Sequence, residues 1–415
     1  MSRRSTSLWL LVVLVAVVSG CVRPPRWRAD DEPHAGDVEA ALTATNYADL
    51  DRALAAGEIA QVPMRTRLRP CCAFGADLGA KVGPVPVPGY RIGNMLDPED
   101  VGPHTFDSGV LRVRRAEQEA VLLNNEKNGL VYTCRGGFID TAHVRDYADW
   151  GIFLGATNAR TVEEGTTVEL PPEGGSRRIV FEPVPEELIE RFGRLRIAST
   201  TTEAITFQLS IWHEIATWFG FASVPGFPEK ASAFSPEDLY SNLLGIKLAR
   251  ALARRRSGRE ENIYNRSVTQ WMDQGIDFLD PVPEEVARDA MRAVDGVWWD
   301  SGTRLPDPRL VLRRSFEYRD PVKPWLVPDS LAPESLVEHC GRSARPLPLP
   351  NKARVKGIRI DDFVTLEIEL DDHLASQEPF LTLGRKITQR DFPAIIEALQ
   401  GQNREEFGPR ANQPD

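Results

Sequence analysis

One apolar segment, residues 201–220, constrains the fold of this chain most. At about 100° per residue in a helix, its polar side chains gather on one narrow face: Glu203, Thr206, Ser210, His213, Glu214 and Thr217. The rest of the circumference is apolar except for Gln208. Because a helix that is apolar nearly all round is buried, the segment predicts a central helix whose polar face lines a cavity or another polar face.

The remaining patterns predict an α+β fold with a mainly helical central body, small β hairpins and a loop-rich N-terminal part. Residues 62–110 are the loop-rich part, since they carry many Pro and Gly without a sustained period. Strands are expected at 129–134, 166–170, 178–181, 354–360 and 363–370. Helices are expected at 37–56, 141–155, 185–193, 201–219, 236–256, 266–278, 283–297 and 389–400, with Thr200 and Glu203 at capping-box spacing.

The N-terminus has the layout of a secretory signal. Arg3 and Arg4 precede an apolar run from Leu8 to Val18, which ends at Ser19-Gly20-Cys21. The run is too short for a transmembrane helix, which needs about 20 apolar residues. We therefore expect a signal peptide at 1–20, a tether at 21–36, a main α+β domain at 37–300 and, at 301–415, a C-terminal extension with a small hairpin and a terminal helix.

Residues 18–21 resemble the lipobox of bacterial lipoproteins. The resemblance implies cleavage before Cys21, diacylglycerol on its thiol, and a further fatty acyl chain such as palmitate on its amine. Several acyl chains on one residue anchor a protein stably, whereas an ordinary signal peptide would leave no anchor. Val22 follows in place of Asp, which by the same resemblance favours the outer membrane, with the body facing the periplasm.

Charge excludes one class of partner. Loss of Arg3 and Arg4 with the signal peptide takes the formal charge from −10 to −12. An acidic body of this kind offers no broad field for nucleic acid and no basic face for anionic lipid. The expected contact with the membrane is therefore the lipidated Cys21 alone.

The pair His213-Glu214 opens like the metalloprotease signature, in which two histidines at i and i+4 bind zinc and the Glu acts as general base. Thr217 stands where the second histidine would be, so other ligands must come from elsewhere. His104, in a loop, and His143, near a helix start, complete a three-histidine set with Glu214 as the catalytic base. Such a set suits zinc or another divalent metal with an open position for water. The alternative is that each histidine is a structural residue with satisfied hydrogen bonds.

Three further polar residues are candidates for the same site. Asp140 can cap the helix that begins at Thr141. Asp238 and Asn242 lie on one stripe of the 236–256 helix, and Asp238 or Glu237 could supply an acidic ligand. The alternative for both acids is a helix start that is acidic because it complements the helix dipole.

Four cysteines remain after Cys21: Cys71, Cys72, Cys134 and Cys340. In an oxidising compartment they can form one or two disulfides, and three full pairings are open. We favour a bond from Cys134 to Cys71 or Cys72. A Cys/His hydrolase that uses one of these thiols is the competing chemistry, but its nucleophile would have to stay reduced.

Three runs of sequence carry a family resemblance: residues 132–146, 71–75 and 212–218. They are similar to an uncharacterised family, a domain of unknown function, of bacterial envelope lipoproteins, over about residues 60–280. The resemblance implies a shared fold and the same compartment. It implies no activity.

Two functions therefore compete. One is a metal-dependent hydrolase of periplasmic peptide, peptidoglycan or glycan material, with His213 and Glu214 at its centre. The other is a non-catalytic structural or assembly lipoprotein. The hydrolase requires His213, Glu214 and at least one of His143, His104 or Asp238 to lie within a few ångströms, whereas the scaffold leaves them apart.

Overall fold

A computed structural model describes residues 33–43, 62–65, 68–69, 72–106, 112–115, 118–121, 126–222, 229–252, 261–341, 343–349, 354–355 and 358–415. The expected signal peptide, most of the tether, Cys21 and Cys71 lie outside these residues. None of the helices within these ranges is long and apolar enough to cross a membrane.

The α+β expectation is confirmed, with a helical body and small antiparallel sheets. The helices are α1 Ala35–Thr43, α3 Thr141–Thr161, α4 Glu186–Phe192, α5 Arg194–Trp218, α6 Asp238–Leu252, α7 Glu261–Phe278, α8 Glu284–Ala293, α9 Glu334–His339, α10 Asp372–Ala375, α11 Phe380–Leu383 and α12 Phe392–Phe407. The strands are β1 Leu78–Val82, β2 Val85–Ile92, β3 Arg112–Arg115, β4 Gln118–Val121, β5 Leu130–Thr133, β6 Gly137–Asp140, β7 Thr166–Leu170, β8 Gly175–Phe181, β9 Arg354–Val355, β10 Ile358–Arg359, β11 Val364–Leu370 and β12 Lys386–Thr388.

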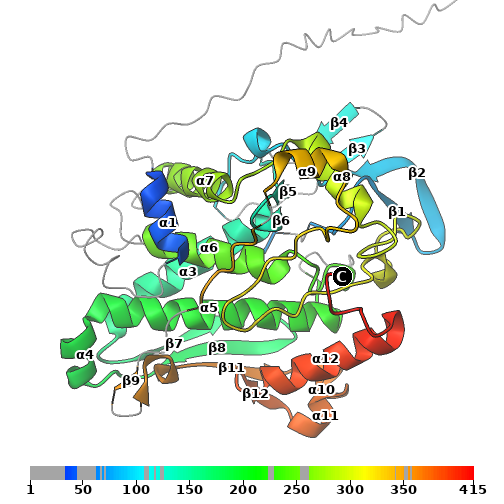
Figure 1. Cartoon of the computed structure of the whole chain (residues 1–415). Helices are drawn as coiled ribbons and strands as arrows, with labels where there is room; N and C mark the ends of the chain where they lie inside the picture. The colour runs from blue at the N-terminus through cyan, green and yellow to red at the C-terminus, as the bar shows by residue number, and fades with distance from the viewer. Residues whose placement is uncertain are drawn as a thin grey trace, which may run out of the picture.

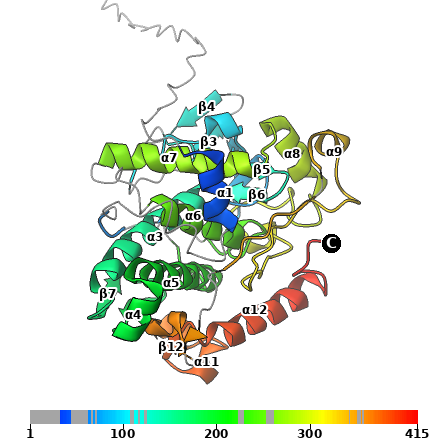
Figure 2. The same cartoon turned by 60° about the vertical axis from the view of Figure 1, so that its left-hand side comes forward.

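Helix α5 runs through the middle of the molecule (Figure 1). The sheet β12-β11-β8-β7 lies along one side of it, and α3, α6 and α7 lie on the other, as the turned view also shows (Figure 2). Nearly every side chain of α5 from residue 197 onward is buried, as its apolar circumference requires.

The C-terminal part of the chain is joined to this body through β11. This strand pairs antiparallel with β8 from Val364↔Phe181 to Leu370↔Gly175. Its apolar residues belong to the same core as those of α3, α5 and α6. Residues expected to form an extension thus complete the sheet that covers α5.

Helices α3 and α6 approach each other closely, and this approach positions the site. Asp140 caps α3 as expected, because its Oδ1 accepts hydrogen bonds from the backbone N–H groups of Ala142 at 2.7 Å and His143 at 3.2 Å. A Cβ at Gly245 of α6 would lie 2.1 Å from the Val144 carbonyl oxygen of α3. Only glycine fits there, so the first turn of α3 packs directly against the middle of α6.

The predicted capping box at the start of the central helix is wrong. Helix α5 begins at Arg194, and the Thr200 hydroxyl donates to the Arg196 carbonyl oxygen inside the helix. Glu203 is instead buried between Lys247 and Arg250 of α6, each at 2.9 Å. Capping-box spacing also occurs inside helices, and the longer helix here is stabilised by packing against α3 and α6.

The loop-rich segment before residue 110 contains a hairpin that the sequence did not predict. Strands β1 and β2 form it, and β3 and β4 extend it to a four-stranded sheet. Proline and glycine within β2 hide the alternation that marks a strand. The expected strand at 129–134 and the hairpin at 166–181 are confirmed as β5 and as β7–β8.

The predicted disulfide partner of Cys134 is wrong. Cys134 is bonded to Cys340, which is 206 residues away in sequence, with a Cα–Cα distance of 5.1 Å. Cys72 is a free cysteine. The bond joins the turn after β5 to the end of α9, and this proximity arises only when the later part of the chain packs on the β5–β6 hairpin.

Candidate metal centre

The structure brings together His143, His213 and Glu214. His143 lies in the first turn of α3, whereas the other two lie near the C-terminal end of α5. One donor atom from each residue lies within 4.8 Å of the other two, and the three residues are 3%, 2% and 1% exposed. Two imidazoles and one carboxylate are a donor set that suits a divalent transition metal.

Each histidine has a carboxylate beside its Nδ1 atom. His213 Nδ1 is hydrogen-bonded to Glu173 Oε1, and His143 Nδ1 lies 3.4 Å from Asp238 Oδ1. Metal-binding histidines in proteins typically have such a carboxylate on the nitrogen that does not bind the metal, because it fixes the tautomer and the ring orientation. For His213, this pairing therefore leaves Nε2 as the ligand atom.

Glu173 reaches this position from the turn between β7 and β8. Its second carboxylate oxygen forms an ion pair with Arg177 on β8. Its backbone carbonyl oxygen accepts a hydrogen bond of 3.0 Å from the Trp212 indole N–H, next to His213. The turn is thus attached to α5 by both its backbone and its side chain.

Only one of the two carboxylate oxygens of Glu214 has a hydrogen-bond partner among the described residues. Its Oε2 accepts a hydrogen bond of 2.9 Å from the Phe234 backbone N–H. Its Oε1 is buried, with no hydrogen-bond partner anywhere in the described residues. A buried carboxylate oxygen without a partner is costly, and a cation coordinated by His143, His213 and this oxygen would remove that cost.

The centre has an excess of buried acids. Six buried carboxylates interact with the two histidines or with one another: Asp140, Glu173, Glu214, Glu229, Glu237 and Asp238. Two guanidinium groups lie beside them, those of Arg177 and Arg314. This imbalance favours either protonation of some acids or a bound cation.

The pKa values reflect that imbalance. Burial, followed by the charge of Asp140, raises the pKa of Glu237 well above its ordinary value. Burial, followed by the charges of Glu214 and Glu237, does the same to the pKa of Asp238. Burial alone would lower the pKa of His213, but the Glu173 carboxylate outweighs it and raises that pKa to about 9. Without a bound metal, the His213 imidazole is therefore in its doubly protonated, cationic form near neutral pH.

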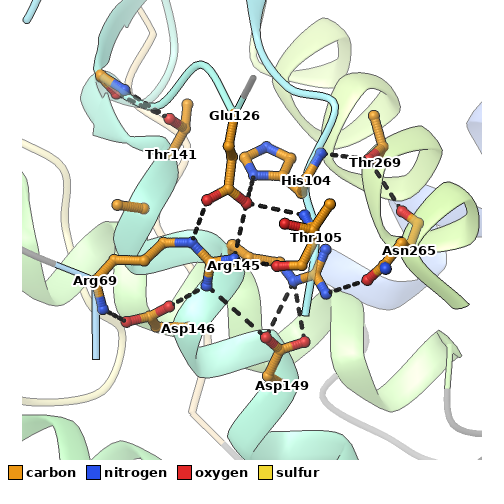
Figure 3. A network of polar contacts seen from close by, with 12 residues as sticks. Arg69, His104, Thr105, Glu126, Thr141, Arg145, Asp146, Asp149, Asn265 and Thr269 are labelled. Carbon is orange, nitrogen blue, oxygen red and sulfur yellow. Dashed lines mark hydrogen bonds and ion pairs between the residues drawn. The ribbon is translucent and has the colours of Figure 1, made fainter. Parts of the chain in front are cut away.

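His104 does not join the other two histidines, so the predicted three-histidine set is wrong. The Nδ1 atom of His104 lies 3.3 Å from Glu126 Oε1 (Figure 3). Burial lowers the pKa of His104. Glu126 in turn is bound by Arg69 at 2.8 Å. The loop that carries His104 packs on the α3 face that carries Arg145, roughly 200° around the helix from His143.

We call this second cluster the Arg69 network. It contains three guanidinium groups and three carboxylates together with His104: Arg65, Arg69, Arg145, Glu126, Asp146 and Asp149. Arg65 contacts Asp149 at 2.7 Å, and Arg145 contacts the same carboxylate at 3.0 Å. Because its charges balance, the network needs no additional ion.

Two of the three further candidates, Asp140 and Asp238, contact the elements of the metal centre. Asp238 contacts His143, as described, and Asp140 holds the start of α3 while its Oδ2 accepts from the Cys72 backbone N–H at 3.1 Å. Asn242 is buried, and neither atom of its amide has a hydrogen-bond partner within the described ranges. Asp140 and Asp238 thus support the ligands rather than complete the set.

Residues 59–328 match DUF4056, a family described as protein of unknown function. The chain belongs to the DUF4056 family. The matched residues include His143, His213 and Glu214 as well as Glu173 and Asp238. No curated protein and no solved structure matches the chain.

In this DUF4056 chain the candidate thiols that the structure describes are poor nucleophiles, whereas Cys71 lies outside the described residues. Cys134 is in a disulfide. Burial, followed by the charge of Asp140, raises the pKa of Cys72 well above its ordinary value. A thiol in that environment stays protonated and is a poor nucleophile.

Sequence reasoning missed Glu173 and Arg177 of the DUF4056 domain. Both lie in or beside Pro-Pro-Glu-Gly-Gly, which indicates only a hairpin turn. Nothing in that local pattern shows that the turn packs on α5. A buried glutamate in a turn becomes recognisable only when its ion pair and its contact with His213 are seen.

Proposed function

We propose that this protein is a lipid-anchored, metal-dependent hydrolase of the bacterial envelope. The observation that carries the proposal is the convergence of one donor atom each from His143, His213 and Glu214 within 4.8 Å. Two histidines and one glutamate form the protein ligand set of several catalytic zinc sites, which leave a further position for water or substrate. Zinc is therefore the metal we expect.

This arrangement changes the role of Glu214. The sequence pattern favours it as a general base, but one of its carboxylate oxygens lies within 4.8 Å of the histidine donors. Its Oε1 has no hydrogen-bond partner among the described residues, and we assign Glu214 as the third ligand. Glu173 and Asp238 orient the two imidazoles, and Arg177 holds Glu173 in its charged form. A bound divalent metal would lower the pKa of a water molecule at the open position.

The proposed location follows from the N-terminus. Residues 18–21 resemble a lipobox, and acylated Cys21 would hold the body at the outer membrane on its periplasmic side. Substrates that a tethered periplasmic enzyme can reach are peptides, peptidoglycan and glycans. A Cys21→Ser variant should move from the membrane fraction to the soluble periplasmic fraction.

The deciding experiment is metal analysis of the full chain extracted from membranes in detergent. The wild type should hold about one equivalent of zinc and cleave peptidoglycan or fluorescein-labelled casein, with cleavage lost after chelation and restored by zinc. His143→Ala should lose the metal while keeping its helical circular dichroism. Wild-type protein without bound metal after incubation with zinc would reject the proposal.

A non-catalytic structural role is the second candidate, and the burial of the centre favours it, since none of the three ligands is more than 3% exposed. In that case the metal would join α3 to α5, with no open position for water. The wild type would then bind zinc tightly and gain stability from it, but would cleave neither substrate.

A further inference from the structure

Two buried carboxylate oxygens in the described parts of the chain have no hydrogen-bond partner: Glu214 Oε1 and Glu237 Oε2. Both lie at the metal centre, where the charges of the two residues interact. The first is assigned as a metal ligand. The second lies outside the ligand set, because the group whose donor atoms converge contains only His143, His213 and Glu214 within the described ranges.

Glu237 is held by its other oxygen. Its Oε1 lies 3.1 Å from the Ser235 hydroxyl, which also lies 3.0 Å from Asp238 Oδ2. Asp238 in turn lies against His143. One hydroxyl therefore connects Glu237 to Asp238, the acid that lies against His143, so Glu237 belongs to the same buried acidic cluster.

Two neighbouring acids, Asp238 and Glu173, have no such buried oxygen without a hydrogen-bond partner among the described residues. Asp238 Oδ2 accepts hydrogen bonds from the Ser235 backbone N–H at 2.6 Å and from the Ser235 hydroxyl at 3.0 Å, and its Oδ1 lies 3.4 Å from His143 Nδ1. Glu173 uses one oxygen for His213 and the other for Arg177. A group that accepts a proton from a reacting water needs a lone pair that no other donor occupies.

We propose that Glu237 is the general base of the hydrolysis proposed above, and that the bond cleaved is an amide. The inference rests on that proposed function. The oxygen of a water molecule bonds to the amide carbon as one of its protons moves to Glu237 Oε2. The carbon–nitrogen bond then breaks, and Glu237 delivers this proton to the leaving nitrogen, so that one water is consumed and Glu237 returns to its starting state.

The surroundings of Glu237 suit this role. A catalytic base works best when it holds a proton more tightly than an exposed glutamate does. Burial and the neighbouring charge of Asp140 raise the pKa of Glu237 in that direction.

The test uses cobalt-loaded protein and acetohydroxamate, a small metal-binding acid that gives up a proton as it binds. Visible absorption reports both cobalt binding and hydroxamate binding, so no natural substrate is needed. Glu237→Gln should keep cobalt affinity within about twofold but bind acetohydroxamate at least ~10-fold more weakly, the effect of one lost charge-assisted hydrogen bond. Any amide cleavage that the wild type performs should slow by about 10²–10⁴-fold. Exposed Glu285→Gln is the matched control.

Each of the other possible results rejects one named part of the proposal. Loss of cobalt from Glu237→Gln would make Glu237 a ligand and overturn its assignment as the base, as would equal acetohydroxamate binding by variant and wild type. Failure of the wild type to bind cobalt would reject the metal centre itself. Cobalt binding without acetohydroxamate binding in the wild type would reject catalysis. If Glu237→Gln does not fold, Glu237→Asp, which keeps the carboxylate but shortens its reach, should show an intermediate loss.

Discussion

Two buried clusters of histidine and acidic residues contact different parts of α3, and they differ in charge balance. The Arg69 network matches three guanidinium groups with three carboxylates around His104. The metal centre places six carboxylates beside two guanidinium groups and two histidines, and two of its carboxylate oxygens have no partner in the described structure. Both are equally buried, so burial alone does not distinguish them.

The comparison shows what distinguishes a ligand site from a structural network. Opposite charges that satisfy one another stabilise a fold without an additional ion. An excess of buried acids with unsatisfied oxygens needs a cation, a proton or water. A histidine in the first setting is therefore structural, whereas a histidine in the second is a candidate ligand.

The largest expected effect is on metal content, and it distinguishes His213 from His104. His213→Ala should reduce bound zinc from about one equivalent to none, because a single carboxylate and one imidazole bind too weakly. His104→Ala, an equally buried change in the Arg69 network, should keep the metal. Zinc measured in the two folded variants tests this directly, and equal metal content in both would break the comparison.

The next effect concerns stability. Arg69→Met should lower the free energy of unfolding by about 3–5 kcal/mol, because Glu126 and Asp146 would be left buried without their partner. Arg178→Met is the control, since Arg178 is 53% exposed in its pair with Glu367 and its loss should lower the free energy of unfolding far less. Urea unfolding of both variants measures the difference. A small decrease in the unfolding free energy of Arg69→Met would contradict this and would mean that water replaces the guanidinium group.

A smaller effect is expected at Glu173, which touches His213 but not the metal. Glu173→Gln should weaken zinc binding by about 10–100-fold, since the amide orients the imidazole less strongly than the carboxylate does. Competition with a chromophoric chelator measures the affinity. An unchanged affinity would make Glu173 a structural partner of Arg177 alone.

The smallest effect is a pH dependence of the Arg69 network. Burial lowers the pKa of His104. In the unfolded chain His104 therefore takes up a proton below about pH 6.5, whereas in the folded chain it does so only at lower pH. Stability should therefore fall as pH drops below that value, by at most about 1.4 kcal/mol per pH unit. The lowered pKa of Asp149 adds a further loss at more acidic pH. His104→Gln should flatten the first part of the curve, and an unchanged curve would contradict the assignment.

Much of the fold could be predicted from local patterns. The cap at Asp140, the hairpin at 166–181 and the buried helix at 201–218 all appear where sequence signals place them. These signals act over a few residues, through hydrogen bonds to nearby backbone and through side-chain periodicity. The sheet β1–β4 escaped prediction because proline and glycine within β2 obscure its alternation.

The site was only partly predictable for a related reason. A polar face on a buried helix indicates His213 and Glu214 from the sequence alone, because an apolar circumference forces such a face to meet another polar group. The choice of His143 over His104, the approach of Glu173 and the bond from Cys134 to Cys340 all join segments that are far apart in the chain. Such contacts depend on how α3, α5, α6 and the β7–β8 turn pack together, and only the tertiary structure decides that.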